Sequence, residues 1–311
     1  MENKDIINNS ALKLDNICKI YNRNFVLSNL SMNVYEKDIY GLIGENGSGK
    51  TTIIRIITGL IKPNSGSYSL FGVDSKDSRI FDVRKSMGAI VEAPSVYLNM
   101  SALDNMRQMG VLLNIKDDEK FKEVLRIVGL NDVIESKKVA NNFSLGMRQR
   151  LGIGMSLLSN PKLLILDEPM NGLDPEGIVS LRNLLLDLNE RGITIIISSH
   201  ILSELSMIAT RYGIISKGQM IKEISNEEVK EAVTPKLILK VNDISKSYEL
   251  LKNDYQILIK NDSIEISGNY DLNTIISLLQ KENICITNIN QQEENIEDYY
   301  MNLIKGGHYN A

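Results

Sequence analysis

Cysteine, histidine and long apolar runs are scarce in this 311-residue sequence, and each scarcity excludes a class of protein. The two cysteines, Cys18 and Cys285, stand far apart, so we expect a reduced pair and no disulfide framework. Two histidines, His200 and His308, are too few for a multi-histidine metal site. No apolar run approaches the roughly 20 residues that a membrane-spanning helix requires.

The charge balance lacks the basic excess that is typical of nucleic-acid-binding proteins. There are 35 Lys and Arg residues against 39 Asp and Glu residues, which gives a net charge of −4 at pH 7. We therefore predict that nucleic acid is not a partner. Residues 1–10 are polar and include Glu2 and Asp5, so they lack the basic and then apolar order of a secretory signal. We expect a soluble chain of two domains.

Residues 44–52, with the sequence GENGSGKTT, match the phosphate-loop pattern G-x-x-x-x-G-K-[ST]. The flanking sequence favours the match, because residues 39–43 predict a short buried strand and residues 51–61 predict an apolar helix. Such a turn points backbone N–H groups at one anion, and the helix start adds about half a positive charge. The predicted nucleotide-binding residues of this loop are Gly44, Asn46, Gly47, Ser48, Gly49, Lys50, Thr51 and Thr52.

Single residues of the loop have distinct predicted roles. An ammonium group fits among phosphate oxygens, so we expect Lys50 to contact the β- and γ-phosphates. The hydroxyl of Thr51 is a candidate magnesium ligand. Gly47 and Gly49 let the backbone approach the phosphates, because neither residue has a Cβ.

A second strong signal is the acidic pair Asp167 and Glu168, directly after the apolar run 163–166. Consecutive large apolar residues predict a parallel strand buried on both faces, and such sheets bind ligands at the carboxyl ends of their strands. We predict that Asp167 holds magnesium, directly or through water, and that Glu168 orients or deprotonates the attacking water. Without a cation the two acids would repel each other, which argues against a purely structural role.

Four further positions have both a functional and a structural interpretation. Tyr21 is either an aromatic residue that stacks on a purine base or an ordinary residue at a strand end. Glu92 ends the short predicted strand 88–92, either as a magnesium ligand or as a solvated acid. His200 follows a buried strand and either reaches a γ-phosphate or is a structural histidine. Ser144 caps a predicted helix whose start is either a second anion site or a plain capped terminus.

The predicted order of elements divides the chain at Pro235. In residues 1–234 a helical block at about residues 95–160 interrupts an α/β core. The strands and helices predicted before this block include 12–20, 25–35, 67–71 and 80–87, and those predicted within it include 101–113, 116–128 and 132–138. Residues 235–311 follow the order strand, helix, strand, strand, helix, strand, which predicts a small ferredoxin-like sandwich. Its elements are predicted at 236–241, 244–251, 255–260, 263–267, 272–280 and 285–289, with a last helix near 296–304.

With the phosphate loop, the segment 143–147 (FSLGM), the Asp167-Glu168 pair and His200 in this order, the chain resembles the ATPase subunit of an ABC transporter. The resemblance covers about residues 12–231. It implies a P-loop NTPase core with antiparallel β and inserted helical subdomains, followed here by a small α+β domain, and it implies ATP and Mg²⁺ as ligands. The roles that it implies are adenine stacking for Tyr21, signature contacts for Ser144 and Gly146, magnesium binding for Asp167, catalysis for Glu168, a dimer contact for Asp174 and a switch for His200.

Two positions depart from the family pattern. The usual signature is L-S-G-G-Q, and Leu145 stands here at its first glycine. The family usually has glutamine at the position of Glu92, which the resemblance places near both magnesium and the surface that faces the permease. With residues 93–94 and 143–150, these features resemble the bacterial group that exports bacitracin and lantibiotics.

The resemblance also implies an assembly. One phosphate loop cannot enclose a nucleotide, so the signature helix of a second copy would complete each site, and two chains would clamp two ATP molecules head to tail. The helical block would pass the motion to a separate membrane permease that handles a peptide substrate. The ATPase would then be cytoplasmic and peripheral on the inner face of the membrane.

Other proteins with a phosphate loop remain as alternatives. Ribosome-acting members of the family carry two phosphate loops in one chain, and DNA-acting members carry a long inserted coiled coil; this sequence has neither. A GTPase requires an N-K-x-D motif after the loop, and none follows. Only Glu92 and the C-terminal domain argue against the ATPase of an importer, so that alternative stays open.

Overall fold

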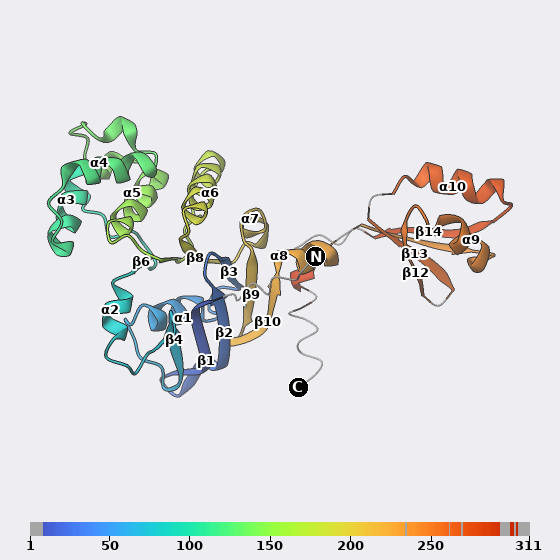
Figure 1. Ribbon diagram of the computed structural model, residues 1–311, viewed down its shortest axis with the longest axis horizontal. Helices are drawn as coiled ribbons and strands as arrows, with labels where there is room; N and C mark the ends of the chain where they lie inside the picture. The colour runs from blue at the N-terminus through green and yellow to red at the C-terminus, as the bar shows by residue number, and fades with distance from the viewer. Residues whose placement is uncertain are drawn as a thin grey trace, which may run out of the picture. The chain divides into compact units, whose positions relative to one another are not determined.

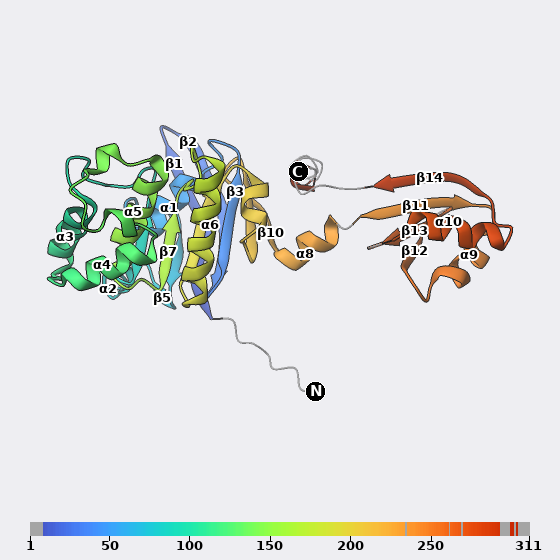
Figure 2. The ribbon, with the colours of Figure 1, turned by 90° about the horizontal axis from the view of Figure 1, so that it is seen from above.

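The computed structural model describes residues 9–233, 235–260, 262–268, 270–292, 299–301 and 303. The chain divides into two compact units between Asn226 and Glu227. The sequence places the boundary later, at Pro235, after helix α8 (Asn226–Ala232). Figures 1 and 2 show the elements of each unit from two directions.

An antiparallel sheet forms one layer of the first unit. Its strands are arranged in the order β2-β1-β4-β5. Leu14 of β1 pairs with Met32 on one side and with Tyr68 on the other, and these side chains are buried. The strand bounds are β1 (Ser10–Tyr21), β2 (Asn24–Tyr35), β4 (Ser65–Leu70) and β5 (Val73–Asp74).

A six-stranded sheet forms the second layer, in the order β10-β9-β3-β8-β7-β6. Its strands run parallel except for the pair β9 and β10. The central strands β3, β7 and β8 are buried along their whole length, as expected for parallel strands covered on both faces. The bounds are β3 (Ile39–Gly44), β6 (Met87–Ile90), β7 (Leu163–Leu166), β8 (Thr194–Ser199), β9 (Arg211–Ser216) and β10 (Gln219–Ser225).

Helix α1 (Lys50–Ile57) belongs to the core that both sheets share. Its four isoleucines are fully buried, because the same hydrophobic cluster contains residues of β1, β2 and β4 as well as β3, β7 and β8. The helix ends earlier than the predicted 51–61. Thr58 is its C-cap, and Gly59 follows with a φ of 79°, the left-handed conformation that ends many helices.

Three helices form the block that interrupts the core, α3 (Ala102–Leu113), α4 (Asp118–Ile127) and α5 (Leu145–Leu157), and Figure 1 shows them grouped together. Ser101 and Ser144 cap α3 and α5 as predicted, because each hydroxyl accepts a backbone hydrogen bond in the first turn. The helix predicted at 132–138 is wrong. Only a short 3₁₀ turn forms there (Asn131–Val133), and Val139 makes a strand-like bridge to Ser101.

Three further helices complete the first unit, α2 (Ile80–Arg84), α6 (Pro175–Glu190) and α7 (Leu202–Ser206). Helix α2 is shorter than the predicted 80–87, because β6 already begins at Met87. Asp174 caps α6 by accepting the N–H of Gly177.

The second unit contains a four-stranded antiparallel sheet in the order β12-β13-β11-β14. Its core joins Leu237 and Ile264 of the sheet to Leu251 of α9 and Ile275 of α10. This strand order and the chain order β-α-β-β-α-β are those of a ferredoxin-like sandwich. The bounds are β11 (Lys236–Val241), α9 (Ile244–Leu251), β12 (Gln256–Lys260), β13 (Ser263–Ser267), α10 (Leu272–Lys281) and β14 (Ile286–Gln292). The last helix, predicted near 296–304, lies largely outside the described residues.

Candidate nucleotide site

The phosphate loop connects β3 to α1 and depends on glycine at two left-handed positions. Gly47 has a φ of 81° and Gly49, the N-cap of α1, has a φ of 111°. A Cβ on Gly49 would lie 2.6 Å from the Cδ2 atom of Leu27, so a larger residue would also collide with β2. Ser48 Oγ is buried and has no hydrogen-bond partner within the described residues. The loop therefore contains a polar group that a bound anion could satisfy.

Lys50 is buried in the loop, with 5% of its surface exposed. Its Nζ donates hydrogen bonds to the carbonyl oxygens of Gly44, at 2.6 Å, and Glu45, at 3.2 Å. The same Nζ lies 3.1 Å from Oε1 of Glu168, an ion pair that joins the loop to the end of β7. A phosphate would therefore meet a lysine that is already positioned inside the loop.

Glu168, the predicted base, also contacts His200. Its carboxylate therefore joins the predicted phosphate-binding lysine to the predicted switch histidine. His200 Nδ1 lies 2.9 Å from Glu168 Oε2. The φ of Glu168 is 47°, a left-handed conformation that costs a residue with a Cβ roughly 1–3 kcal/mol. Its backbone N–H donates a 2.8 Å hydrogen bond to Ser198 Oγ, which helps to hold this conformation.

Ser198 is a site residue that the sequence analysis missed. It lies at the carboxyl end of β8, is fully buried, and donates a 2.6 Å hydrogen bond to Asp167 Oδ1. Its hydroxyl thus bridges the carboxylate of Asp167 and the backbone of Glu168. A hydroxyl that follows a run of apolar strand residues, just before His200, is the signal that could have identified it.

A second carboxyl group lies close to this cluster, on α7. Burial raises the pKa of Glu204, and the charge of Glu168 adds to the increase. The charges of His200 and Arg182 act on the pKa of Glu204 in the opposite direction.

The remaining loop residues and the aromatic residue are placed as follows. Thr51 and Thr52 are half-buried in the first turn of α1, and Asn46 is exposed. Tyr21 ends β1 with 42% of its surface exposed, and Lys19 Nζ lies 5.0 Å from its ring centroid. Its hairpin partner β2 contacts the phosphate loop at Gly49, so the ring is on the strand pair beside the loop.

Glu92 does not join the cluster around Glu168 but forms an ion pair with Arg55 on α1. Its side chain is 62% exposed and its φ is 66°, a left-handed conformation directly after β6. Arg55 is the second residue that the sequence analysis did not single out. The pair connects the phosphate-loop helix to the segment that leads into the helical block.

The signature residues lie beside the turn at 171–174 of the same chain. A Cβ on Gly172 would be 3.1 Å from Leu145, and a Cβ on Gly146 would be 3.7 Å from Leu173. Within the described residues, no hydrogen bond or ion pair joins Ser144 or Gly146 to the phosphate loop. The structure therefore brings Lys50, Asp167, Glu168 and His200 together, but it does not bring the signature to them.

The donor set fits a magnesium ion that shares its ligands with a nucleotide. The described residues contain no group of three or more His, Cys, Asp and Glu side chains that could hold a metal ion. Mg²⁺ typically binds one or two protein oxygens together with substrate phosphates, and Thr51 and Asp167 supply such oxygens.

Across the part of the chain that the structure describes, no helix is both long and apolar enough to cross a membrane.

Comparison with known proteins places these features in a family. A model described as ABC transporter matches residues 27–171, and a second one, described as an AAA domain, matches residues 139–206. The bacitracin transport ATP-binding protein BcrA of Bacillus licheniformis is 38% identical over 96% of this chain and 98% of its own length. The lantibiotic transport ATP-binding protein SrtF of Streptococcus pyogenes is 44% identical over 68% of this chain and 90% of its own length.

Solved structures give the same result for the fold. The ADP conformation of MJ1267, an ATP-binding cassette of an ABC transporter, superposes with a TM-score of 0.63 at 27% identity, over 70% of this chain and 92% of that chain. The structure of cbiO1 from Clostridium perfringens gives a TM-score of 0.64 at 26% identity, over 71% of this chain and 90% of that chain. The predicted fold class, a P-loop α/β core with further subdomains, is confirmed.

Proposed function

Because this chain belongs to the ATP-binding proteins of ABC transporters, we propose that it powers the export of a peptide antibiotic through a separate membrane permease. The protein is an ATPase of that family. The observation that supports the substrate class is similarity to BcrA along nearly the whole of both chains, at 38% identity. That similarity includes the second unit, which lies beyond the part that the family model matches.

The cluster around Glu168 supports a hydrolytic mechanism in which the chain positions charge and water. Lys50 would exchange its ion pair with Glu168 for the β- and γ-phosphates of ATP. Glu168 would then be free to accept a proton from the attacking water, and His200 would contact the γ-phosphate. Thr51 and Asp167 would hold Mg²⁺, with Ser198 orienting Asp167 through its 2.6 Å hydrogen bond. When bound, that ion would neutralise charge on the phosphates.

The position of the signature supports a head-to-tail dimer that encloses two ATP molecules. Ser144 is exposed and Gly146 half-buried, and no hydrogen bond or ion pair among the described residues joins either to the phosphate loop of its own chain, so they are available to the loop of a second copy. In this dimer Tyr21 would stack on adenine, and Asp174 would lie at the contact between subunits. The exposed Glu92 would face the permease, with the ATPase bound to the inner face of the membrane.

The proposal is tested in cells and with the purified chain. The ATPase is expressed together with a candidate permease in a sensitive bacterium, and the inhibitory concentrations of bacitracin and a lantibiotic are measured. Lys50→Ala should abolish both resistance and ATP binding, because the loop loses its only buried ammonium group. Lys85→Ala is the matched control, since that lysine is exposed and forms an ion pair with Asp82, away from the loop.

Two outcomes would contradict separate parts of the proposal. Normal ATP binding by Lys50→Ala, in a fluorescence titration, would refute the phosphate-loop assignment. If the natural chain is fully active as an ATPase but its expression does not change resistance, the result would favour the ATPase of another transporter, or a soluble ATPase of the same family, over a peptide antibiotic exporter.

A further inference from the structure

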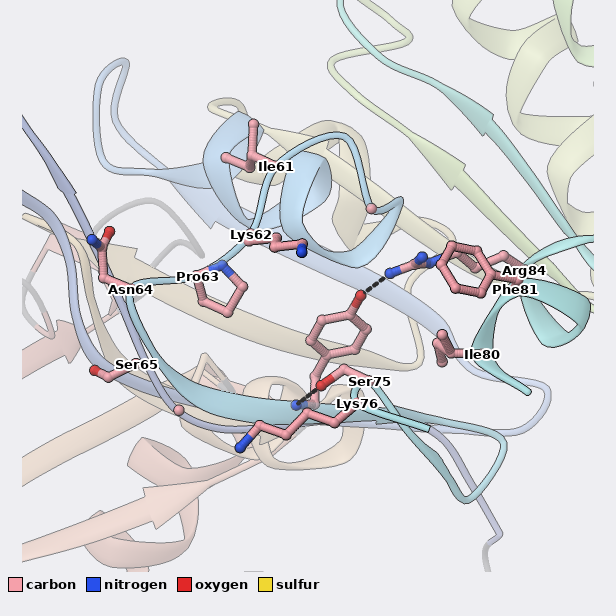
Figure 3. Close-up of a pocket in the computed structure, with 13 residues that line it drawn as sticks. Ile61, Lys62, Pro63, Asn64, Ser65, Ser75, Lys76, Ile80, Phe81 and Arg84 are labelled. Atoms are coloured by element: carbon pink, nitrogen blue, oxygen red, sulfur yellow. Dashed lines mark hydrogen bonds between the residues drawn. The ribbon is translucent and has the colours of Figure 1, made fainter. Parts of the chain in front are cut away.

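A pocket of about 700 Å³ lies at the far end of α1, between β4 and α2 and outside the phosphate loop. Figure 3 shows Ile61, Lys62 and Pro63 of the loop after α1 on one side of it and Arg84 with Phe81 on the other side. Its volume is within the range of roughly 300–1,000 Å³ that is usual for small-molecule sites. The residues that line it are Gly59, Ile61, Lys62, Pro63, Asn64, Ser65, Gly66, Tyr68, Ser75, Lys76, Ile80, Phe81 and Arg84.

The charge of this pocket is opposite to that of the chain. Lys62, Lys76 and Arg84 line it, and none of its lining residues is acidic, whereas the chain as a whole has a net charge of −4. The rest of the lining includes a large apolar part with the aromatic ring of Phe81, 69% of which is exposed. Such a lining suits a ligand that carries both a negative charge and an apolar group.

The guanidinium of Arg84 is held in place by its neighbours, but one of its nitrogen atoms has no hydrogen-bond partner among the described residues. Its Nη2 donates a hydrogen bond to the hydroxyl of Tyr68, while its Nε is buried without a partner among the described residues. The guanidinium carbon lies 5.7 Å from the ring centroid of Phe81 and packs against Gly59, where a Cβ would be 2.5 Å away. None of the residues that line the pocket is acidic, so an anion there would give the Arg84 guanidinium a partner of opposite charge, and guanidinium groups bind carboxylate or phosphate through parallel N–H groups.

We propose that this pocket binds a small amphipathic anion, in which an aromatic or acyl group carries a phosphate or a carboxylate. The anionic head contacts Arg84, with Lys62 and Lys76 contributing positive charge. The apolar part packs on Phe81 and Ile80. The site is separate from the nucleotide site, because none of residues 44–52 lines it.

The first experiment is calorimetric titration of the purified full chain with 1-naphthyl phosphate, with ADP in excess to fill the nucleotide site. We expect saturable binding that is at least about tenfold tighter than that of 1-naphthol or inorganic phosphate alone. Arg84→Gln should weaken it at least about tenfold. Arg79→Gln is the matched control, because that arginine is exposed, pairs with Asp77 and does not line the pocket, so binding should be unchanged.

Three results would overturn the proposal. The first is that Arg84→Gln binds 1-naphthyl phosphate as tightly as the natural chain does. The second is that binding is seen without ADP but is lost when ADP is in excess. The third is tighter binding of an acidic peptide that Arg84→Gln abolishes, which would indicate a protein partner instead. If Arg84→Gln fails to fold because it loses the bond to Tyr68, Lys76→Gln decides, since Lys76 lines the pocket from the segment before α2 and the same weakening is expected.

A second measurement separates the two sources of such an anion. The chain is mixed with vesicles of phosphatidylcholine that contain phosphatidic acid, and flotation is compared between the natural chain and Arg84→Gln. Flotation that depends on Arg84 would support the site with a lipid as its ligand. Absence of flotation together with naphthyl phosphate binding would support it with a soluble ligand.

Discussion

Lys50 Nζ lies 3.1 Å from Glu168 Oε1, so the predicted phosphate-binding lysine and the predicted catalytic glutamate neutralise each other across the site. Glu168 Oε2 lies 2.9 Å from His200 Nδ1. Both carboxylate oxygens therefore have cationic or proton-donating neighbours before a nucleotide arrives. In the proposed mechanism ATP would replace the carboxylate on Lys50, and this exchange would couple nucleotide binding to the release of the base.

Glu168→Gln should separate binding from turnover. The amide has nearly the same shape but cannot accept a proton, so hydrolysis should fall by about 100-fold or more. ATP should bind at least as tightly, because the ion pair that competes for Lys50 is gone. Phosphate release and nucleotide titration measure the two effects, and size-exclusion chromatography should show an ATP-bound dimer. Unchanged hydrolysis with only monomer would contradict both the role of Glu168 and the clamp.

Ser198→Ala should damage the site from behind the carboxylates. It removes the donor to Asp167 and the acceptor of the Glu168 N–H in a fully buried position, so the free energy of unfolding should fall by about 1–3 kcal/mol. We also expect a higher Mg²⁺ concentration for half-maximal ATPase activity. Urea denaturation and Mg²⁺ titrations measure these effects.

Ser199→Ala is the control for that experiment. Ser199 is the next residue of β8 and is also buried, but its hydroxyl bonds, among the described residues, to the backbone of Ile201 and not to Asp167 or Glu168. Its loss should reduce stability without changing the Mg²⁺ requirement. An equal Mg²⁺ shift in both variants would show that Ser198 has only a structural role.

Glu92→Gln should affect the transporter more than the isolated ATPase. Glu92 pairs with Arg55 in an exposed position, and such pairs contribute at most about 1 kcal/mol, so the fold should tolerate the change. The ATPase rate of the isolated subunit should stay within a few-fold, while antibiotic resistance should fall. Arg55→Gln should reproduce the loss if the pair itself matters. Full resistance would show that Glu92 is a harmless variant, and a collapsed ATPase rate without the permease would favour a direct role at the metal.

A fragment of residues 1–234 should remain a folded, ATP-binding protein. The predicted nucleotide ligands all precede this cut, and the second unit has a hydrophobic core of its own. A shorter fragment, 1–226, keeps the hydrogen bonds of Asn226 to Thr210 and Tyr212 and tests the boundary between the units. Circular dichroism and nucleotide titration provide the measurement. Loss of ATP binding by a soluble 1–234 fragment would show that the ATPase depends on the second unit.

Features that depend on neighbouring residues were predictable from the sequence. Glycine at left-handed turns, caps such as Ser101 and Ser144, and acids after a buried apolar run each have a local physical cause, and the structure has these elements at their predicted places. The six elements of residues 236–292 also lie close to their predicted bounds, because their apolar periodicity is regular.

Features that depend on distant residues were not predictable. No element was predicted at β9 or β10, whose apolar residues are interrupted by glycine and charged residues and which pack against strands from distant parts of the chain, β9 against β3 and β10 against β2. The ion pair of Lys50 and Glu168 joins residues far apart in the chain, so no local pattern encodes it. The composition of segment 132–138 is compatible with a helix, but the chain directly after it is extended, because Val139 forms a strand-like bridge with Ser101.

The contact between Leu145 and Gly172 has a mechanical consequence. A bulky side chain at the first position of α5 packs against the turn that ends at Asp174, the cap of α6. With a glycine there, the two helix starts could slide past each other. Leucine fills this space, so we expect the start of α5 and the turn before α6 to move together in any motion of the helical block.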